Sequence, residues 1–256
     1  IYMYKKILVS IVIPFRKKKK YFNSTINSIC NQTFKNYEVI LIYDDIDKDD
    51  LEFVENNLKK IKNKKLIINK KTLGPGLSRN IGIKYAKGKF IAFCDADDTW
   101  KKNKLFEQIN FMKKNNLSFS HSSYNIINSE GKKTGKYMVK KNLYYTDLIK
   151  SCDIGLSTVI LEKKILGKNK FCDLKTKEDY YLWLKLVKKL KVLNGTGKYL
   201  TNWRSLRKSL SSSKTQRLMD AYRLYNNFEN YNGLLSIYYV LRLSIYSLIK
   251  KYKIYF

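Results

Sequence analysis

The stretch from Phe90 to Asp98 constrains the fold of this chain more than any other. Five apolar residues, Phe90 to Cys94, run directly into Asp95, Ala96, Asp97 and Asp98. An apolar run without polar alternation needs burial on both faces, as in a parallel sheet covered by helices. Carboxylates at its carboxyl end then lie at the crevice where open α/β sheets bind their ligands.

Two interpretations of this acidic loop are open. Asp95 and Asp97 are separated by one small residue, a spacing that lets both carboxylates converge on a divalent cation and the phosphates it carries. Alternatively, these are solvated loop acids that cap a helix beginning near Lys101. The loop alone does not decide between them, and the rest of the chain favours the first.

Strand and helix patterns alternate along the first 117 residues, which predicts an α/β fold with a mostly parallel, doubly wound sheet and helices on both faces. We expect Pro14 to end the first strand and Gly74-Pro75-Gly76 to form a turn. The strands are predicted at Val9–Ile13, Tyr37–Tyr43, Leu66–Ile68 and Phe90–Cys94, and the helices at 21–32, 50–61 and 78–86.

The pattern loosens after residue 117. Strands are predicted at Ser118–Ile127 and Leu156–Leu161, and an amphipathic helix at Lys177–Leu190. We expect residues 1–213 to form one domain with two halves, 1–117 and 118–213. Residues 214–256 then form a C-terminal helical extension, with helices predicted at Gln216–Asn230 and Gly233–Tyr252.

The net charge of +31 is compatible with nucleic acid, a membrane surface or a polyanionic substrate. Of the 52 basic residues, however, 7 are Arg and 45 are Lys, whereas specific phosphate recognition usually relies on Arg. A nucleic-acid-binding protein would also leave the acids at the strand ends without a role, so we expect no nucleic acid partner. The charge permits anionic partners without identifying them.

The four cysteines and one histidine do not predict a structural zinc site. No cysteine pair has C-x-x-C spacing, and Cys30 and Cys94 lie in apolar runs typical of buried thiols. We expect a reducing cytoplasmic location and no secretory signal peptide, because the first apolar run precedes its lysine cluster.

Three further groups could carry chemistry. A second apolar strand ends in acids, Asp44 and Asp45, and neighbouring strand ends share a crevice. The segment from Gly74 to Arg79 combines a turn, a helix N-terminus and a guanidinium, which suit oxyanions, although it is also an ordinary turn. Glu178 and Asp179 open the helix that carries Trp183; they either stabilise its dipole or supply a general base.

Taken in order, these motifs resemble family 2 glycosyltransferases over roughly residues 7 to 212. The resemblance rests on an ordered set of segments with characteristic spacing: Val9–Pro14, Ser28–Phe34, Tyr43–Asp45, Asn69–Gly82, Ala86–Ile91, Asp95–Asp98 as the DxD element, Glu178–Asp179 with Leu182–Leu184 as the ED element, and Trp203–Arg204 with Ser209–Ser211 as a closing segment.

The resemblance implies a GT-A fold and an inverting, metal-assisted sugar transfer from a nucleotide-diphosphate donor, with a UDP-sugar favoured. It also implies a nucleotide-sugar half at residues 1–117 and an acceptor half at 118–213. It places Asp179 as catalytic base, Asp97 on Mg²⁺ or Mn²⁺, and a nucleotide-binding set of Pro14, Arg16, Asp45, Arg79 and Asp95. Further donor or acceptor contacts are implied for Asp44, Ala96, Glu178, Trp203 and Arg204. The chain departs from the family pattern after Pro14, where Phe15, Arg16 and Lys17 replace the usual aromatic–Asn pair, and after Asp45, where Ile46 and Asp47 replace a Gly–Ser turn.

The expected acceptor is a surface glycan or a lipid-linked glycan, and a polyprenyl-phosphate glycosyltransferase is the rival enzyme. The last helix is rich in Leu, Ile and Tyr but carries Arg242, so it either packs on the domain or lies on a membrane. We therefore expect a cytoplasmic protein, peripheral on the inner face of the membrane, with an anionic membrane surface as a partner.

Overall fold

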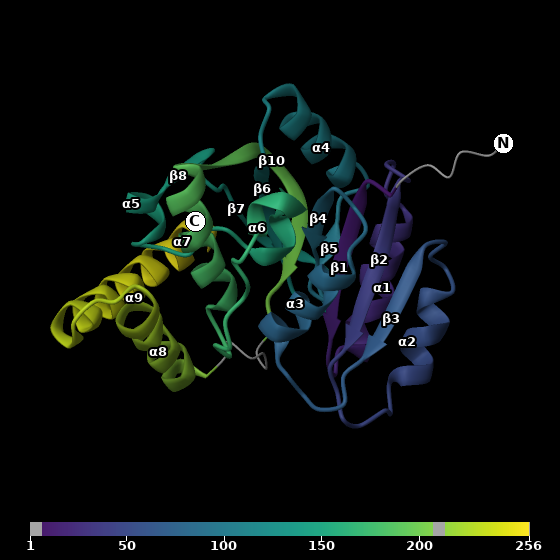
Figure 1. Ribbon diagram of the computed structural model, residues 1–256, viewed down its shortest axis with the longest axis horizontal. Coiled ribbons are helices and arrows are strands. Elements are labelled where there is room, and N and C mark those ends of the chain that lie inside the picture. Colours follow the sequence, from purple (N-terminus) through teal and green to yellow (C-terminus); the bar gives the residue numbers. More distant parts are fainter. Residues whose placement is uncertain (1–6, 207–212, 256) are drawn as a thin grey trace.

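The computed structural model describes residues 7–206 and 213–255, and Figure 1 shows its helices arranged around a twisted sheet. Ten strands form this sheet, whose main path follows the order β3-β2-β1-β4-β9-β6-β10-β5, while β7 pairs with β6 and β8 pairs with β10. The strands are β1 (Val9–Phe15), β2 (Tyr37–Tyr43), β3 (Lys64–Ile68), β4 (Phe90–Phe93), β5 (Thr99–Trp100), β6 (Phe119–Ile127), β7 (Lys133–Tyr137), β8 (Asn142–Tyr144), β9 (Ile160–Glu162) and β10 (Val192–Arg204).

The helices occupy both faces of the sheet and the C-terminal end of the chain. They are α1 (Lys19–Cys30), α2 (Leu51–Leu58), α3 (Pro75–Tyr85), α4 (Lys104–Lys114), α5 (Tyr145–Leu148), α6 (Lys163–Leu166), α7 (Glu178–Leu190), α8 (Lys214–Arg223) and α9 (Gly233–Tyr255), with a 3₁₀ turn at Leu156–Thr158 and a π-helical turn at Leu224–Phe228. The predicted C-terminal helices are thus present as α8 with its π-helical turn and α9, at the lower left of Figure 1.

The predicted α/β sheet is confirmed, with a mixed second part. Strands β3, β2, β1 and β4 are all parallel. Strand β9 then pairs antiparallel with both β4 and β6, and β6 continues parallel to β10. The strands of the predicted nucleotide and acceptor halves therefore belong to one sheet, so the two halves share a hydrogen-bonded framework.

Side-chain alternation along the parallel strands divides the core into two layers. In β1, Val9, Ile11 and Ile13 join a cluster with residues of α1, α2 and α4. Val12 points to the opposite face, into a cluster that includes Trp183 of α7. This two-sided burial is the physical reason why these strands are apolar throughout.

Two sequence predictions about boundaries were wrong. Strand β1 continues through Pro14 to Phe15, because β4 pairs only with Val9–Val12 and leaves the last part of β1 at an edge, where proline is tolerated. Helix α3 begins at Pro75, inside the predicted turn, since a proline at the first helical position sacrifices no intrahelical hydrogen bond.

The sequence pattern also missed β10, a 13-residue strand next to β6. Gly195 and Gly197 interrupt its alternation, and both have structural reasons. A Cβ on Gly195 would lie 2.3 Å from the His121 ring, and Gly197 has a positive φ of 68°. Similarly, the predicted strand Leu156–Leu161 is a 3₁₀ turn followed by β9, so only its second part belongs to the sheet.

Candidate active site

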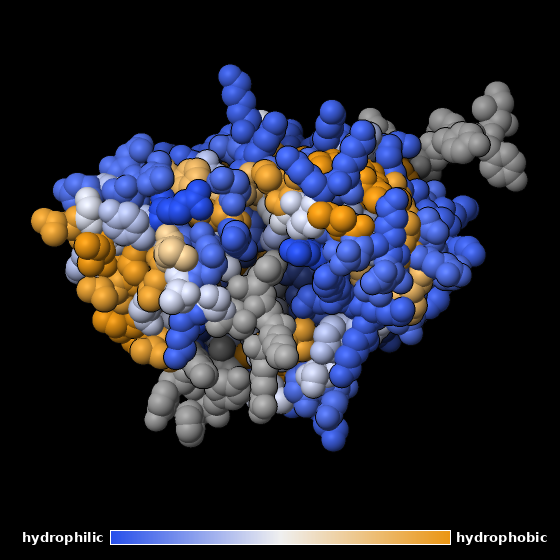
Figure 2. Space-filling model, turned by 90° about the horizontal axis from the view of Figure 1, so that it is seen from below, coloured by the Kyte–Doolittle hydropathy of each residue, from blue (hydrophilic) through white to orange (hydrophobic). Residues whose placement is uncertain are grey.

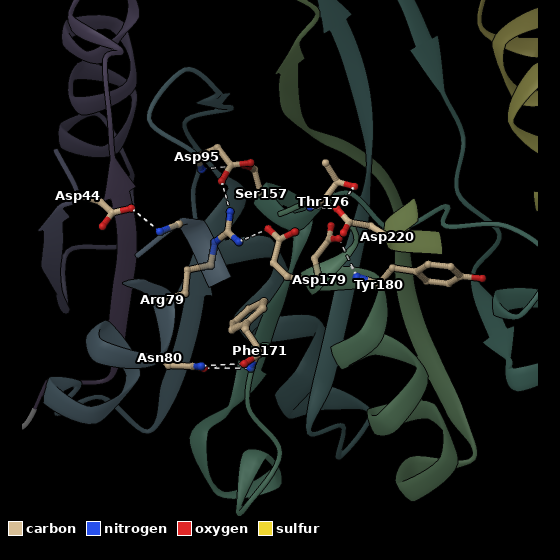
Figure 3. Close-up of polar contacts among 12 residues, drawn as sticks. Asp44, Arg79, Asn80, Asp95, Ser157, Phe171, Thr176, Asp179, Tyr180 and Asp220 are labelled. Carbon is tan, nitrogen blue, oxygen red and sulfur yellow. Dashed lines mark hydrogen bonds and ion pairs between the residues drawn. The ribbon is translucent and has the colours of Figure 1, made fainter. Parts of the chain in front are cut away.

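The carboxyl ends of β1, β2 and β4 lie side by side, so the acids that follow β2 and β4 share one edge of the sheet. Figure 3 shows Asp44 and Asp95 at this edge and Asp179 approaching from the N-terminus of α7. The chain therefore brings together acidic groups that lie more than a hundred residues apart in sequence, as the crevice argument predicts.

Arg79 connects the DxD loop to helix α7. Its guanidinium donates to Asp95 Oδ1 and to Glu178 Oε1, both at 2.7 Å, and the Arg79 side chain is 4% exposed. The cation also lies over the Phe171 ring, 5.4 Å from its centroid. A buried cation is tolerated when it is paired and hydrogen-bonded, so this bridge fixes the relative positions of the two acidic segments.

Asp44 organises the loop that leads into α3. Its carboxylate accepts hydrogen bonds from Asn69 Nδ2 at 2.7 Å and from the backbone N–H groups of Leu73 and Gly74, each at 2.8 Å. Gly74 has a φ of 86°, a conformation that suits glycine. These bonds use both oxygens of Asp44, and its predicted contact with a donor or acceptor stays a prediction, as does the nucleobase contact of the adjacent, buried Asp45.

Asp97 faces a lysine that the sequence analysis did not single out. Lys18 Nζ lies 2.6 Å from Asp97 Oδ2, and the Asp97 side chain is 15% exposed. Burial raises the pKa of Asp97, whereas the Lys18 charge opposes that rise. Lys18 precedes α1 and follows the basic residues that replace the usual family pattern, so this chain places a cation beside its DxD loop.

Strand β10 holds the same loop from the other side. Asp98 Oδ1 accepts from the Arg204 backbone N–H at 2.8 Å, and Arg204 Nε donates to the Asp97 carbonyl at 2.8 Å. Burial raises the pKa of Asp98 well above its usual value. Behind the loop, Ser157 Oγ accepts from the Asp95 N–H at 3.0 Å. Together with Arg79 and Lys18, these contacts hold the DxD loop from four separate segments of the chain.

The first turn of α7 presents two carboxyl groups with raised proton affinity. Burial raises the pKa of Glu178 to about 7, with the Arg79 charge opposing it. Burial also raises the pKa of Asp179, again opposed by Arg79. A carboxylate whose pKa moves towards neutrality becomes a better proton acceptor, so the first turn of α7 supplies candidates for a general base.

The residue just before this turn is held by the C-terminal extension. Asp220 of α8 is 0% exposed and accepts from the Thr176 backbone N–H at 2.8 Å and from Thr176 Oγ1 at 2.9 Å. Figure 3 shows this contact beside Asp179. The position of the catalytic candidate therefore depends on α8. This contact joins residues 44 apart in sequence, and no local pattern predicts it.

The DxD loop has a donor set that suits Mg²⁺ or Mn²⁺. Asp95 and Asp97 offer carboxylate oxygens, and residues 7–206 and 213–255 contain no cluster of three or more His, Cys, Asp or Glu side chains arranged to hold a metal. Hard cations that retain several water ligands are commonly bound by one or two carboxylates together with substrate phosphates. The residues present fit an ion of this kind.

The structure brings some of the predicted site residues into direct contact and shows whether others are exposed or buried. Arg79, Asp95 and Glu178 are in direct contact, and Pro14 lies half-buried in β1 near the same sheet edge. Arg16 is exposed, Ala96 is buried with its carbonyl accepting from Thr25 Oγ1 at 3.0 Å, and Trp203 is 41% exposed. The predicted closing residues Ser209–Ser211 lie outside the described residues.

Sequence reasoning missed Lys18, Asn69, Ser157 and the structural role of Asp98. Their contacts with Asp97, Asp44, Asp95 and Arg204 join segments 25 to 106 residues apart, so no local pattern marks them. A hint was available for Lys18, because the basic run Arg16–Lys20 stands where the family has uncharged residues and immediately follows a strand that enters the crevice.

Known proteins share this arrangement over most of the chain. A glucosyltransferase of Escherichia coli, UDP-Glc:alpha-D-GlcNAc-diphosphoundecaprenol beta-1,3-glucosyltransferase WfgD, is 36% identical over 241 residues, which cover 91% of each chain. The putative teichuronic acid biosynthesis glycosyltransferase TuaG of Bacillus subtilis is 28% identical and covers 88% of this chain and 89% of its own. Both similarities extend over most of this chain and most of each relative.

Solved structures agree with the fold. S. aureus TarS 1-349 in complex with UDP-GlcNAc superposes with a TM-score of 0.68 at 20% identity, covering 91% of this chain and 70% of that one. The mannosyltransferase PcManGT of Pyrobaculum calidifontis, in complex with GDP-Man and Mn²⁺, gives a TM-score of 0.68 at 11% identity, covering 93% and 70%. The sequence model of glycosyl transferase family 2 matches residues 10–170. The chain is a glycosyltransferase and belongs to glycosyl transferase family 2.

Proposed function

We propose that this protein transfers a sugar from a UDP-sugar to a hydroxyl group of a lipid-linked glycan, with inversion at the anomeric carbon. The observation that carries the proposal is the Arg79 bridge, which holds the DxD residue Asp95 next to the helix turn bearing Asp179. Relatives that act on a UDP-Glc donor and a diphosphoundecaprenol-linked acceptor support the choice of substrates.

The donor occupies the edge formed by β1, β2 and β4. Asp45 contacts the nucleobase and Asp95 faces the ribose and diphosphate, while Pro14 and Arg16 line the base side. Arg79 lies beneath the donor, where its charge favours a diphosphate and its two ion pairs keep Asp95 in place. Support for uracil comes from the UDP-GlcNAc complex of the structural neighbour TarS.

Asp179 acts as the single base of the transfer. Its carboxylate takes the proton from the acceptor hydroxyl as that oxygen attacks the anomeric carbon, and the bond to the nucleoside diphosphate breaks on the opposite face. The raised pKa of Asp179 supports this role, since the proton must pass to the carboxylate near neutral pH. Inversion follows because one displacement occurs.

Asp97 would hold Mg²⁺ or Mn²⁺, with Asp95 as the second acidic group of the loop. The bound ion would offset the negative charge of the departing diphosphate, which removes the need for a general acid. Lys18 stays close enough to Asp97 to balance its charge. The Mn²⁺ complex of the structural neighbour PcManGT supports a divalent ion in this fold.

The acceptor enters on the side of β10 and α7. Trp203 is exposed there, with its ring edge-to-face with Tyr124 at a centroid separation of 6.3 Å, and an exposed aromatic ring suits the apolar face of a sugar. Glu178 and Arg204 stand behind this side. A lipid-linked acceptor places the enzyme in the cytoplasm at the inner face of the membrane.

Two measurements test the proposal. Calorimetric titrations of UDP and GDP, each with and without Mn²⁺, are expected to show metal-dependent UDP binding in the wild type that is lost in Asp97→Asn. The matched control is Asp173→Asn, which neutralises an exposed carboxylate outside the site. No binding of either nucleotide, or equal loss in both variants, would overturn the site assignment.

The second measurement follows transfer from UDP-sugars to a synthetic GlcNAc-diphospholipid and to polyprenyl phosphate. Proton NMR of the product reports the new linkage. A product with the anomeric configuration inverted relative to the donor is expected on the diphospholipid. Transfer to polyprenyl phosphate instead would identify the rival enzyme, and a retained configuration would exclude the single-base mechanism.

A further inference from the structure

Helix α9 exposes a continuous apolar stripe. Leu234, Ile237, Leu241, Ile245 and Leu248 are 84%, 51%, 60%, 57% and 69% exposed, and they recur at intervals of three and four residues along one face. The stripe is far longer than the isolated apolar side chains that ordinary surfaces carry.

Neighbouring side chains widen this surface. Helix α8 adds three exposed apolar residues, and α9 adds four more beside its stripe. Figure 2 shows an apolar surface at the left of the molecule, where α8 and α9 lie in Figure 1. We call this surface the α8–α9 face; besides the stripe, it comprises Leu218, Met219, Tyr222, Leu235, Tyr238, Tyr246 and Ile249.

The opposite side of α9 packs against the rest of the protein. Ser236 and Leu243 are 0% and 6% exposed, and Tyr239 stacks on Tyr231 with ring centroids 4.9 Å apart. Near the end of the helix, Lys250 Nζ donates to the Cys152 carbonyl at 2.9 Å and lies 4.4 Å from the centroid of the Tyr137 ring.

Both its length and its apolar composition would allow Gly233–Lys250 to cross a membrane. A spanning helix would have to leave the domain and expose its polar packing contacts to lipid. Because one side is held by the protein along several turns, α9 lies along the surface with its other side free. This is the geometry of a helix that rests in a membrane interface.

The charge of this region selects the kind of partner. Residues 214–250 contain two acids, Asp220 and Glu229, and both are buried and hydrogen-bonded within the protein. Four basic residues of the same segment remain at least partly accessible to solvent, namely Lys214, Arg217, Arg223 and Arg242, whereas Lys250 is engaged with Cys152 and Asp153 on the packed side of α9. An apolar face bordered by cations, with its acids withdrawn, complements an anionic bilayer better than a second copy of this basic chain.

We propose that the α8–α9 face docks on the surface of an anionic lipid bilayer, with the apolar stripe of α9 inserted among the headgroups and upper acyl chains. The cations bordering the stripe contact the lipid phosphates. Tyr222, Tyr238 and Tyr246 suit the interface, because each ring combines an apolar body with a polar hydroxyl.

Docking at this face has a consequence for the site. Asp220 links α8 to Thr176, three residues before Asp179, and Lys250 links α9 to Asp153 at 3.6 Å on the side of Tyr124. The lipid surface would thus be adjacent to elements that border the acceptor side. This last step rests on the proposed function; the docking itself depends on no transfer chemistry.

The test is sedimentation of the full chain with sucrose-loaded vesicles of phosphatidylcholine, with and without phosphatidylglycerol. Leu241→Gln/Leu248→Gln changes the stripe without altering charge. Ile68→Gln/Phe106→Gln is the matched control, since these side chains are exposed apolar residues outside the α8–α9 face. Circular dichroism verifies that both variants are folded, and a repeat at high salt separates insertion from charge attraction.

We expect the stripe variant to bind anionic vesicles about tenfold more weakly than the wild type or more, because two leucines lose apolar contact. The control should bind as the wild type does, and part of the wild-type binding should persist at high salt. Equal vesicle binding by all three proteins, or binding that salt abolishes completely, would overturn the proposal. Concentration-dependent dimers that the stripe variant loses, without vesicle binding, would assign the face to a second copy. We expect the stripe variant to bind UDP as the wild type does. Loss of vesicle binding with UDP binding unchanged would show that the two proposals are tested independently.

Discussion

The sheet edge that carries the DxD loop, which we call the crevice, and the α8–α9 face differ in where their side chains find partners. At the crevice, Asp95, Asp97 and Glu178 each pair with a cation from another segment of the same chain. In the extension, the acids are satisfied internally while a row of leucines and isoleucines faces solvent. The first region is assembled by the fold itself, whereas the second presents a surface that a partner would complete.

The largest effect should come from breaking the internal pairing of the crevice. Arg79→Met leaves Asp95 and Glu178 without their shared cation, so we expect the free energy of unfolding to fall by about 3–5 kcal/mol. Transfer activity should be lost with it. Guanidinium denaturation provides the measurement.

Arg223→Met is the matched control for this change. Arg223 forms an exposed pair with Asp173 at 3.7 Å and a long contact of 3.9 Å with Asp220, and partly exposed pairs of this kind contribute about 1 kcal/mol at most. Equal destabilisation by the two substitutions would contradict the idea that ion pairs within the protein stabilise the crevice more than those at the surface of the extension.

The next effect separates catalysis from stability within the crevice. Asp179→Asn keeps the shape of the side chain but removes the proton acceptor, so kcat should fall by about 10²- to 10⁴-fold. UDP binding should be retained, because the nucleotide contacts lie on the other strand ends. Steady-state kinetics together with UDP titration measure both quantities. A variant that keeps wild-type kcat would show that another group serves as the base.

The parallel part of the fold was accessible from the sequence because its determinants are local. The apolar runs at Tyr37–Tyr43 and Phe90–Cys94 could be located almost to the residue, and the acids that follow them lie at the same edge of the sheet, with β1 between the two strands. Each signal needs only a few consecutive residues, since burial on both faces forces an unbroken apolar run.

Long-range contacts explain what the sequence did not predict. Strand β10 has two glycines inside it, and Gly195 is required by the His121 ring that approaches from β6. Likewise, Lys18 reaches Asp97 across 79 residues of sequence. No residue close to Gly195 or Lys18 in sequence indicates that His121 or Asp97 is its partner. The sequence pattern therefore shows only an interrupted strand and an ordinary lysine cluster.

A smaller effect tests whether the two regions communicate. Asp220→Asn weakens the two hydrogen bonds from Thr176, and charged hydrogen bonds contribute about 1.5–3 kcal/mol each. We expect a loss of stability in this range and a several-fold lower kcat, with vesicle binding unchanged. Thermal unfolding, kinetics and vesicle sedimentation on one preparation measure all three. If the folded variant has the same kcat as the folded wild type, α8 does not position the first turn of α7.

Lys18→Met tests how the cation beside the DxD loop affects metal binding. Without Lys18, Asp97 loses a competing positive charge at 2.6 Å, so Mn²⁺ should bind about three- to tenfold more tightly, corresponding to roughly 1 kcal/mol of charge interaction near a protein surface. Electron paramagnetic resonance of free Mn²⁺ measures this without substrate. Lys20→Met, an exposed lysine of the same run, is the control. Weaker Mn²⁺ binding in Lys18→Met would mean that Lys18 assists the metal site.

The smallest effect is a pH dependence carried by Glu178. Its pKa rises from 4.5 to about 7 in the folded protein because the side chain is buried, so the folded state binds a proton that the unfolded state has already released. The stabilisation from that proton is complete below pH 4.5 and is lost as the pH rises through about 7. The glutamine side chain of Glu178→Gln cannot titrate. As the pH rises across this interval, the unfolding free energy of the wild type should therefore fall relative to that of the variant.

Urea denaturation of both proteins at several pH values within the interval measures the difference directly. Subtracting the variant removes the parallel contributions of Asp97, Asp98 and Asp179, whose pKa values burial also raises. Parallel stability curves for the two proteins would show that Arg79 keeps Glu178 ionised throughout. In that case Glu178 would be ionised and paired with Arg79 at every pH in the interval. The contrast between a crevice of internal ion pairs and the solvent-facing apolar α8–α9 face would then become sharper.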